Sequence, residues 1–426
     1  MDPVSERLRA RHPQKIDLSL DRIRRLLRAV GDPQDRLAPV VHVAGTNGKG
    51  STVALIRAMA EAAGLSVSVY TSPHLVRFNE RIRLAGQLIE DAELEAILDR
   101  LEAVDGDITA TVFEMTTAAA FLAMAETPAD LTIIEVGLGG RLDATNVIDR
   151  TRLSVITPVD HDHAEFLGTD LAGIAGEKAG ILRPGVPAVI ARQPDIAFEV
   201  IEAEAGRLRV PLTVLGRDFD AWAERGGLTF QAEDRLLDLP APALVGHHQI
   251  ANAGVAIAAA LELGLPEDAI ARGLRGVRWP ARMQPLTAGP YADLARARGA
   301  ELWLDGGHNP HAARALADAL AALDLRQPRP TALITGMLAN KDADGFFDAF
   351  RLAQAPVLTV PFEGACRSPA DLAEAARRAG LAAEPMVDVE TALKAALAEG
   401  AGRVLICGSL YLAGEVLGAS PETWPT

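Results

Sequence analysis

Strand-like and helix-like segments alternate along this chain, and this alternation restricts the possible folds more than any other feature. Short apolar runs predict strands at Val40–Ala44, Ser66–Tyr70, Leu131–Val136 and Leu153–Pro158. Segments with helical periodicity lie between them, at Thr52–Ala63, Asp91–Val104 and Glu114–Ala125. Such alternation is typical of a parallel sheet that carries helices on both faces.

The alternation breaks at residues 278–300, which contain three prolines and two glycines without clear periodicity. A second alternation follows, with predicted strands at Glu301–Leu304, Ala332–Thr335, Val357–Val360 and Arg403–Cys407 and predicted helices at His311–Leu323, Asp344–Ala353, Pro369–Arg378 and Thr391–Glu399. A length of 426 residues also favours more than one domain. We therefore predict an α/β protein in which a P-loop-type parallel-sheet ATPase domain, residues 1–284, precedes a smaller Rossmann-like domain, residues 285–426.

The charge and composition of the chain argue against several classes of protein. The formal net charge is −15, so no general basic field would attract nucleic acid or an anionic membrane. Only two cysteines are present, which excludes a disulfide framework. The first thirty residues carry many arginines and no apolar signal-peptide core, and no apolar run is long enough to cross a bilayer. We expect a cytoplasmic protein.

The stretch HVAGTNGKGS, residues 42–51, has the layout of a phosphate-binding loop. Its three glycines allow a tight turn that brings backbone N–H groups close to a phosphate. Lys49 supplies a mobile charge, and a helix begins near Ser51. The strict pattern G-x-x-x-x-G-K-[ST] is broken, however, because Gly50 separates Lys49 from Ser51. The alternative is a glycine-rich turn that only happens to carry a surface lysine.

Several polar residues follow predicted strands and could hold a metal beside that loop. Glu135 ends a buried strand, the place where P-loop proteins bind Mg²⁺ directly or through water. The sequence DHDH, residues 160–163, places two histidines after another strand, although metal-dependent hydrolases carry the same pattern. Ser72 also follows a strand. Each of these residues could instead have a purely structural role.

A local basic run and a polar turn complete the set of candidate residues. Arg77, Arg81 and Arg83 could hold a carboxylate-bearing substrate in this acidic protein, or could lie on a solvated face with Glu80 as their partner. In the second domain, Asp305 and His308 follow a strand, where open α/β sheets place functional groups.

Nine motifs occur in an order that resembles the folylpolyglutamate synthases of the Mur ligase superfamily. They are HVAGTNGKGS, SPHLVRFNERI, EVGLGGRLDATN, DHxxFLG, GEKAGI, WPARM, DGGHNPHAA, GMLANKD and GSLYLAGEV. The resemblance covers almost the whole chain, and the short G-T-N-G-K-G-S loop is this family's form of the phosphate loop. It implies a Mur-ligase-like central ATP-binding domain, a C-terminal glutamate-ligase domain and an active site in the cleft between them.

The resemblance also implies the reaction. In the family, ATP phosphorylates a substrate carboxylate, and the amino group of L-glutamate then displaces phosphate from the acyl phosphate. The motifs IDLSLDRI and SPHLVRFNERIRLAGQ look like the bifunctional type, which adds glutamate both to dihydropteroate, forming dihydrofolate, and to the tail of reduced folates. Folylpolyglutamate synthase activity alone, or another Mur-superfamily amino-acid ligase, is the alternative. We expect a monomer.

Carried over position by position, the family motifs assign roles to individual residues. The expected catalytic residues are Lys49, Lys178 and His308. The expected ATP-binding residues are Gly45, Thr46, Asn47, Gly48, Lys49, Gly50, Ser51, Asn252, Arg282 and Asp305. The expected Mg²⁺ ligands, direct or through water and across two sites, are Ser72, Glu135, His163 and Lys178, with Lys178 carried as a carbamate and a monovalent cation as a further cofactor.

The expected substrate-binding residues are Ile16, Asp17, Leu18, Arg77, Arg81, Thr111, Val112, Phe113, Glu114, Leu142, Asp143 and Ala144. Two departures from the family pattern are WPAR, where WPGR is more usual, and the DHDH cluster, in which His163 has the expected spacing to Phe166. Ala281 is therefore expected to tighten its turn.

Three competing classes fit the sequence less well. Mur-type cell-wall ligases carry an extra N-terminal domain, for which the roughly forty residues before the loop are too few. A metal-dependent hydrolase would leave the phosphate loop unexplained. A GTPase would need N-K-x-D, but Ala343 stands where the aspartate should be.

Overall fold

The computed structural model describes residues 2–13 and 18–426, which form two compact units. Unit 1 lies within Met1–Ala243 and Ile250–Val277, and unit 2 comprises Leu244–Gln249 and Arg278–Thr426. The chain crosses between the units three times, and the last crossing is at residues 277/278, ahead of the expected junction at 284/285. The short segment 244–249, which falls within the expected first domain, residues 1–284, lies with unit 2, where Val245 packs against the core.

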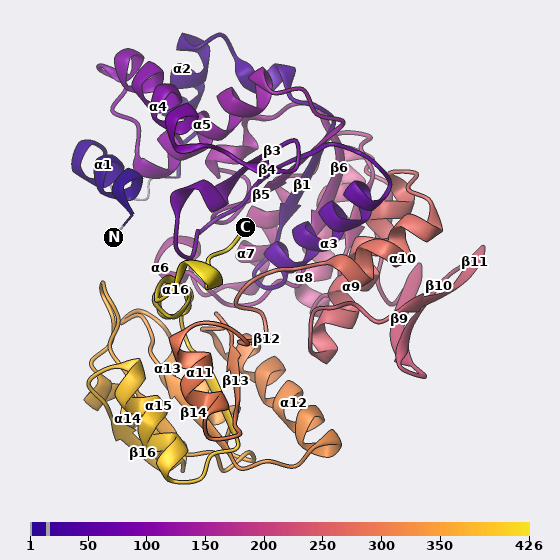
Figure 1. Ribbon diagram of the computed structural model, residues 1–426. Helices are drawn as coiled ribbons and strands as arrows, with labels where there is room; N and C mark the ends of the chain where they lie inside the picture. Colours follow the sequence, from indigo (N-terminus) through magenta and orange to yellow (C-terminus); the bar gives the residue numbers. More distant parts are fainter. Residues whose placement is uncertain (1, 14–17) are drawn as a thin grey trace. The chain divides into compact units, whose positions relative to one another are not determined.

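Unit 1 is built on an eight-stranded sheet with the order β4-β3-β2-β5-β1-β6-β7-β8 (Figure 1). The strands are β1 Val40–Ala44, β2 Val67–Tyr70, β3 Ile82–Leu84, β4 Gln87–Leu88, β5 Leu131–Glu135, β6 Thr151–Ile156, β7 Ala188–Ile190 and β8 Leu212–Val214. The six strands β2, β5, β1, β6, β7 and β8, in this order across the sheet, are parallel to one another. At the edge beside β2, β3 pairs antiparallel with both β2 and β4. The four strands predicted for this domain are confirmed.

The helices of unit 1 cover the sheet. They are α1 Pro3–Arg11, α2 Asp21–Ala29, α3 Lys49–Ala62, α4 Asp91–Asp105, α5 Val112–Glu126, α6 Ala164–Leu167, α7 Leu171–Ala179, α8 Asp195–Leu208, α9 His247–Glu262, whose first residues belong to unit 2, and α10 Glu267–Gly276, with the 3₁₀ turns η1 Pro33–Arg36, η2 Phe78–Arg81 and η3 Ala144–Val147. Ile134 joins the apolar cluster of α2, α4 and α5, whereas Ile156 and Ile190 pack with α7 and α8. Strands covered in this way read as continuous apolar runs, and β1 and β5 are buried along their whole length.

Three further strands of unit 1, β9 Phe219–Glu224, β10 Gly227–Ala232 and β11 Arg235–Pro240, form a separate antiparallel sheet beside α9 (Figure 1). Gly254 of α9 lies so close to Ala221 that a Cβ at position 254 would be 2.6 Å from the alanine Cβ, so the helix needs glycine here.

Unit 2 has a six-stranded sheet with the order β12-β13-β17-β14-β15-β16, parallel except for β12. Its elements are β12 Gln284–Pro285, α11 Pro290–Arg296, β13 Glu301–Leu304, α12 Pro310–Arg326, β14 Thr331–Thr335, α13 Ala343–Asp348, β15 Val357–Thr359, α14 Pro369–Arg378, β16 Ala383–Pro385, α15 Val389–Ala398, β17 Arg403–Cys407, α16 Leu410–Gly418 and the 3₁₀ turn η4 Pro421–Thr423. The predicted helix 344–353 ends early, at Asp348, and the strand β16 was not predicted. Among the residues that the structure describes, every helix falls short of the length and apolar character that a bilayer crossing requires.

Candidate nucleotide-binding site

The candidate motifs of unit 1 meet at one edge of its sheet. Because β1, β2, β5 and β6 are parallel, their carboxyl ends lie together. The register aligns Val43 of β1 with Glu135 of β5, and Ala44 of β1 with Ile156 of β6. Glu135 ends β5, and the glycine loop, the DHDH cluster and Ser72 follow the other three strand ends, as is usual for ligand sites in open α/β sheets.

The glycine loop leaves no space for side chains at two of its turns. Gly45 has φ of +147°, and a Cβ there would stand 1.8 Å from Thr157 Oγ1. Gly48, which precedes α3, has φ of +86°, and a Cβ there would lie 2.6 Å from Asn252 Oδ1. The backbone of the loop thus runs directly against neighbouring side chains, which only glycine permits.

Hydrogen bonds to the segment after β6 hold the loop in place. The backbone N–H of Thr46 donates to the Pro158 carbonyl at 2.9 Å, and its Oγ1 donates to the Asp160 carbonyl at 2.9 Å. The Asp160 N–H donates in turn to Thr46 Oγ1 at 3.0 Å. Sequence patterns indicated no such partner for Thr46, because the two segments are more than a hundred residues apart.

A substitution of Gly45 tests this steric argument. Gly45→Ala should lower the free energy of unfolding by about 1–3 kcal/mol, because the new methyl group must displace Thr157. The measurement is denaturant unfolding together with nucleotide binding, which should weaken. Gly206→Ala is the matched control, since no atom lies within 4 Å of a Cβ built in that helix, and it should stabilise the protein by about 0.5–1 kcal/mol. Equal stability changes of the two variants would contradict the prediction.

Two lysines converge on the same carbonyl of the loop. Lys49 Nζ donates to the Gly45 carbonyl at 3.1 Å and to the Thr46 carbonyl at 3.3 Å. Lys178 Nζ, from α7, donates to the Gly45 carbonyl at 2.9 Å and is buried, with 3% of its surface exposed. Burial, and then the neighbouring charge of Lys49, lower the pKa of Lys178 to about 7. A neutral amine is therefore accessible at this position, and the positive charge of Lys49, with that of Lys178 when it is protonated, favours an anionic ligand.

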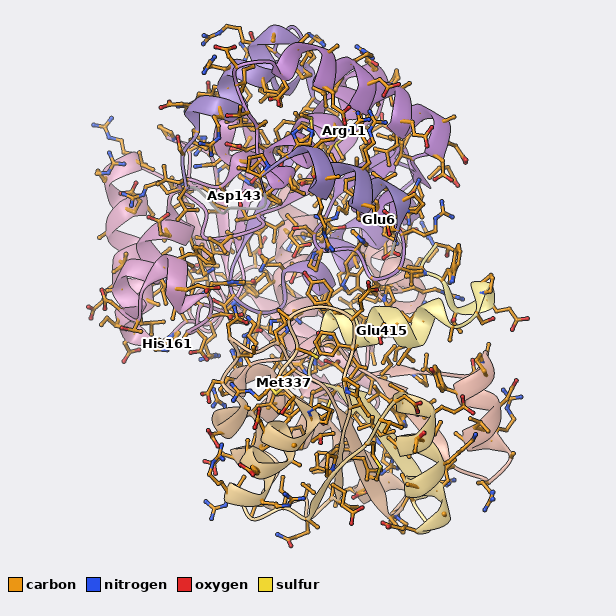
Figure 2. All side chains as sticks on the ribbon, turned by 90° about the vertical axis from the view of Figure 1, so that its left-hand side faces the viewer. Glu6, Arg11, Asp143, His161, Met337 and Glu415 are labelled. Carbon is orange, nitrogen blue, oxygen red and sulfur yellow. The ribbon has the colours of Figure 1, made fainter. Side chains whose placement is uncertain are left out.

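A polar hollow lies beside the loop, within unit 1. It is lined by Gly45, Thr46, Lys49, Val136, Gly137, Leu138, Gly139, Asp162, His163, Leu167 and Lys178. His163 precedes α6 with φ of +54°, which turns the chain into the hollow. His161 does not line it: its ring contacts Asp160 and the Thr169 carbonyl, and Figure 2 shows it at the outer edge of unit 1. Of the two histidines, His163 is the one in position to reach a ligand there.

The donor set at this edge fits Mg²⁺. Among the described residues, no three His, Cys, Asp or Glu side chains gather into a ready-made metal cluster. Mg²⁺ does not require one, because it keeps several waters and is usually held by one or two carboxylates and the substrate phosphates. Glu135 is buried at the end of β5, and Ser72 is half-buried after β2. Ser72, Glu135 and His163 are a small set of protein ligands beside a phosphate loop. Such a set suits Mg²⁺, which takes its remaining ligands from water and the substrate phosphates.

Asp143 organises the glycine-rich segment after β5. Its Oδ2 accepts from the Leu138 N–H at 2.8 Å, and its Oδ1 accepts from the Thr145 N–H and Oγ1 at 3.0 and 2.6 Å. Burial raises the pKa of this carboxyl group, and these donors oppose the shift. The neighbours Leu142 and Ala144 are half-buried and buried.

The segment Thr111–Glu114 begins α5 with a capping box. Thr111 Oγ1 accepts from the Glu114 N–H, and the Glu114 carboxylate accepts from the Thr111 N–H at 2.8 Å and from Arg22 Nε at 3.0 Å. Phe113 covers Gly137, where a Cβ would be 2.3 Å from the ring. The structure thus joins two of the predicted substrate segments. Of the third, Leu18 is half-buried, and Ile16 and Asp17 lie outside the described residues.

The arginines of residues 77–83 have separate surroundings. Arg77 lies 3.4 Å from Asp91, Arg81 Nε donates to His74 Nδ1 at 2.7 Å, and Arg83 donates to the Gly86 carbonyl. Glu80 uses its carboxylate mainly on the backbone, accepting from the N–H groups of residues 75, 76 and 77 at 2.6–2.7 Å. It therefore shapes the turn.

The predicted residues of unit 2 cluster at the end of β13. Asp305 is buried and accepts from the N–H groups of Met283 and Gly307 at 2.7 and 2.6 Å, and burial raises its pKa. His308 Nδ1 lies 2.9 Å from the Gly306 carbonyl. Ala281, beside Arg282, has φ of +53°, a left-handed conformation that favours the glycine more usual at this position.

The chain matches two protein families, which cover most of its length. The Mur ligase middle domain matches residues 43–260, and the Mur ligase glutamate ligase domain matches residues 292–410. Folylpolyglutamate synthase of Lacticaseibacillus casei is 35% identical over 417 residues, covering 93% of this chain and 92% of the relative. Dihydrofolate synthase/folylpolyglutamate synthase of Escherichia coli is 34% identical over 426 residues, covering 95% and 92%.

Solved structures resemble the whole chain as well. FolC of Escherichia coli in complex with DHPP and ADP has a TM-score of 0.85 at 32% identity, covering 96% of this chain and 95% of that one. A bifunctional folylpolyglutamate synthase/dihydrofolate synthase with Mn, AMPPNP and L-glutamate bound has a TM-score of 0.85 at 34% identity, covering 98% of both chains.

Proposed function

The chain belongs to the Mur ligase family, among the dihydrofolate synthases/folylpolyglutamate synthases, and we propose that it joins L-glutamate both to dihydropteroate and to the glutamate tail of reduced folates. It is an ATP-dependent ligase. The observation that carries the proposal is the glycine loop with Lys49 and Lys178 on one carbonyl, beside Glu135 and His163. Such a loop binds nucleotide phosphates, and the family's acceptors are carboxylic acids.

The residues of unit 1 suit phosphoryl transfer to a carboxylate. The backbone N–H groups at the start of α3 and the ammonium group of Lys49 would neutralise the outer phosphates of ATP. Attack by the substrate carboxylate on the γ-phosphoryl group would form an acyl phosphate and release ADP. The glutamate amine would then form the amide bond and release phosphate. These steps need alignment and charge neutralisation more than acid–base groups.

Metal ions would support this transfer. Ser72, Glu135 and His163 would hold Mg²⁺ directly or through water, and the bound ion would neutralise charge on the transferred phosphoryl group. We propose that Lys178 is carried as a carbamate, whose terminal carboxylate would serve a second Mg²⁺. Burial and the lowered pKa of Lys178 support this modification, because CO₂ reacts with the neutral amine. A monovalent cation is proposed as a further cofactor.

The remaining site residues are assigned by their place in the family motifs. Asn252, Arg282 and Asp305 are proposed to bind ATP, and His308 to act close to the reacting groups. The pteridine side of the substrate is proposed to contact residues 16–18, 111–114 and 142–144. Support comes from Phe113, which lies against Gly137 of the segment that Asp143 organises. We further propose that the protein is a cytoplasmic monomer.

A coupled assay of ADP release tests the function. ADP should form only when L-glutamate and a pteroate or folate acceptor are both present with ATP and Mg²⁺. Dihydropteroate and tetrahydrofolate, offered in separate reactions, should each yield a product heavier by one glutamate. ADP release that does not depend on both substrates would contradict the ligase assignment. If only tetrahydrofolate yields a product, the protein has folylpolyglutamate synthase activity, and the proposed dihydrofolate synthase activity is wrong.

A further inference from the structure

Asn146, the last residue of the motif EVGLGGRLDATN, uses its whole amide group to join two segments of unit 1. It is buried in the 3₁₀ turn η3. Its Nδ2 donates to the Arg141 carbonyl at 2.9 Å and to the Gly180 carbonyl at 3.0 Å, and its Oδ1 accepts from Arg183 Nη2 at 2.7 Å. Since a carbonyl oxygen only accepts and an arginine only donates, this orientation of the amide satisfies all three partners.

Gly180 directly follows α7, the helix that carries Lys178. The last carbonyl groups of a helix need partners from outside its regular bonding pattern. Here the Glu177 carbonyl accepts from the Arg141 N–H at 2.7 Å, and the Gly180 carbonyl accepts from Asn146. The segment that ends at Asn146 therefore supplies hydrogen-bond donors to the end of this helix.

Two glycines allow the segment and the helix to approach this closely. A Cβ at Gly140 would lie 2.5 Å from the Glu177 carbonyl oxygen and 3.1 Å from Lys178 Cα. A Cβ at Gly180 would lie 2.3 Å from Arg141 Cβ. The backbone of the lysine is therefore in direct contact with the glycine-rich segment, and displacement of one would displace the other.

Arg183 ties the same groups together. Its Nη1 donates to the Gly180 and Leu182 carbonyls, each at 3.3 Å, and its Nε donates to the Ile148 carbonyl at 3.1 Å. Its Nη2 donates to the carbonyl as well as to Oδ1 of Asn146, at 3.3 and 2.7 Å. A planar guanidinium group holds such partners in fixed directions, and its positive charge is favourable at the C-terminus of a helix.

The last turn of α7 determines where the Lys178 side chain lies. Lys178 is the second-last residue of the helix and is buried, and its Nζ donates to the Gly45 carbonyl at 2.9 Å. A buried amine that meets one carbonyl at this distance tolerates little displacement of its backbone, because a hydrogen bond weakens steeply as its geometry departs from the optimum.

We propose that Asn146, together with Arg183, is a positioning residue that fixes the last turn of α7 so that Lys178 Nζ lies beside the glycine loop. The catalytic consequence rests on the proposed function, because that function gives Lys178 its role in phosphoryl transfer. The fixed position of Nζ does not depend on that function and can be measured without turnover.

Substitution of Asn146 should lower kcat through Lys178. Asn146→Leu keeps the approximate size of the side chain and removes its hydrogen bonds, whereas Asn146→Asp removes only the two donors. Each should lower kcat by about 10–100-fold, the effect of displacing a functional group by about 1 Å. In a Lys178→Met background, Asn146→Leu should lower kcat no further, because the two residues act through one another.

Asn79→Leu is the matched control. Asn79 is also a buried asparagine of unit 1, and its Nδ2 donates to the Ile89 carbonyl and to Asp91 Oδ1, each at 2.8 Å. Its loss should lower the thermal stability about as much as the loss of Asn146. Any fall in kcat should add in full to the fall caused by Lys178→Met, because neither printed partner of Asn79 belongs to α7 or to residues 140–146.

A second variant keeps the test valid if Asn146→Leu unfolds below the assay temperature. Arg183→Lys changes a half-buried side chain and retains its charge, but a lysine cannot donate in the directions of the guanidinium group. It should also lower kcat, and its effect should likewise disappear in the Lys178→Met background.

Acetylation by acetic anhydride tests the position of Lys178 without turnover. In bicarbonate-free buffer, Lys178 of the wild-type protein should react far more slowly than Lys394, an exposed lysine. Asn146→Leu should increase the rate of Lys178 acetylation, measured by mass spectrometry, by about 10-fold, because the end of α7 opens more often. Asn79→Leu should leave this rate unchanged.

The two measurements separate this inference from the proposed function. A wild-type protein that forms no glutamate-dependent ADP would contradict the proposed function, and the acetylation rates would then decide the role of Asn146. In an active protein, normal kcat in both Asn146 variants, or a full additional loss in the Lys178→Met background, would overturn that role. An unchanged rate of Lys178 acetylation in Asn146→Leu would overturn it as well.

Discussion

Replacement of Lys49 by alanine is expected to reduce ADP formation by about 1000-fold, the effect of removing a preorganised charge from a phosphoryl-transfer site. The fold should change little. Lys49 Nζ donates to two carbonyl groups of the loop, whereas Gly45, Gly48 and the bonds between Thr46 and Asp160 hold the loop. Steady-state ADP release and far-UV circular dichroism measure the two effects.

Lys394→Ala is the matched control for this substitution. Lys394 is an exposed lysine of unit 2 that pairs with Glu390, four residues before it. Its loss should leave the activity unchanged and should change the free energy of unfolding by no more than about 0.5 kcal/mol. A Lys49→Ala protein that retains normal turnover would remove the loop lysine from the mechanism.

Replacement of Lys178 by methionine is expected to lower kcat by about 100–1000-fold. Methionine retains the length and apolar bulk of the buried side chain but cannot become a carbamate. If the carbamate supplies an anionic group, then a short carboxylic acid such as acetate should restore part of the activity by occupying its place. The measurement is kcat as a function of acetate concentration, with Lys49→Ala as the control that acetate should not rescue.

Direct observation of the lysine gives a second test of the carbamate. A crystal of the active, nucleotide-bound protein should show density for a carboxyl group on Lys178 Nζ. An unmodified lysine in such a crystal, together with a Lys178→Met variant that acetate does not activate, would contradict the assignment.

Local patterns were sufficient to predict much of unit 1. The buried strands β1 and β5 read as continuous apolar runs because both faces of a parallel sheet are covered. The glycine loop could be recognised because its turns require glycine whatever surrounds them. Strand ends such as Glu135 could be proposed as ligand positions, because parallel strands direct their carboxyl ends to one edge.

Contacts between distant segments could not be predicted in this way. Thr46 and Asp160, or Ser5 and His74, are partners only because the sheet order brings their segments together. The membership of segment 244–249 in unit 2 was not predictable either, since prolines and glycines mark a change of local structure but not which core a segment joins. Glu114 illustrates the same limit, because its ion pair with Arg22 joins residues 92 positions apart in the chain.

The sequence by itself determined the α/β class, the phosphate loop and the family, because periodicity, glycine requirements and ordered motifs are properties of local segments. Only the tertiary structure showed that Lys178 is buried against the Gly45 carbonyl and that His163, which the spacing to Phe166 had favoured, lines the hollow. It also brought His74 Nδ1 within 2.7 Å of Arg81 Nε, which donates to it. The direction and pKa of a side chain depend on what packs around it, and that environment is assembled from segments far apart in the chain.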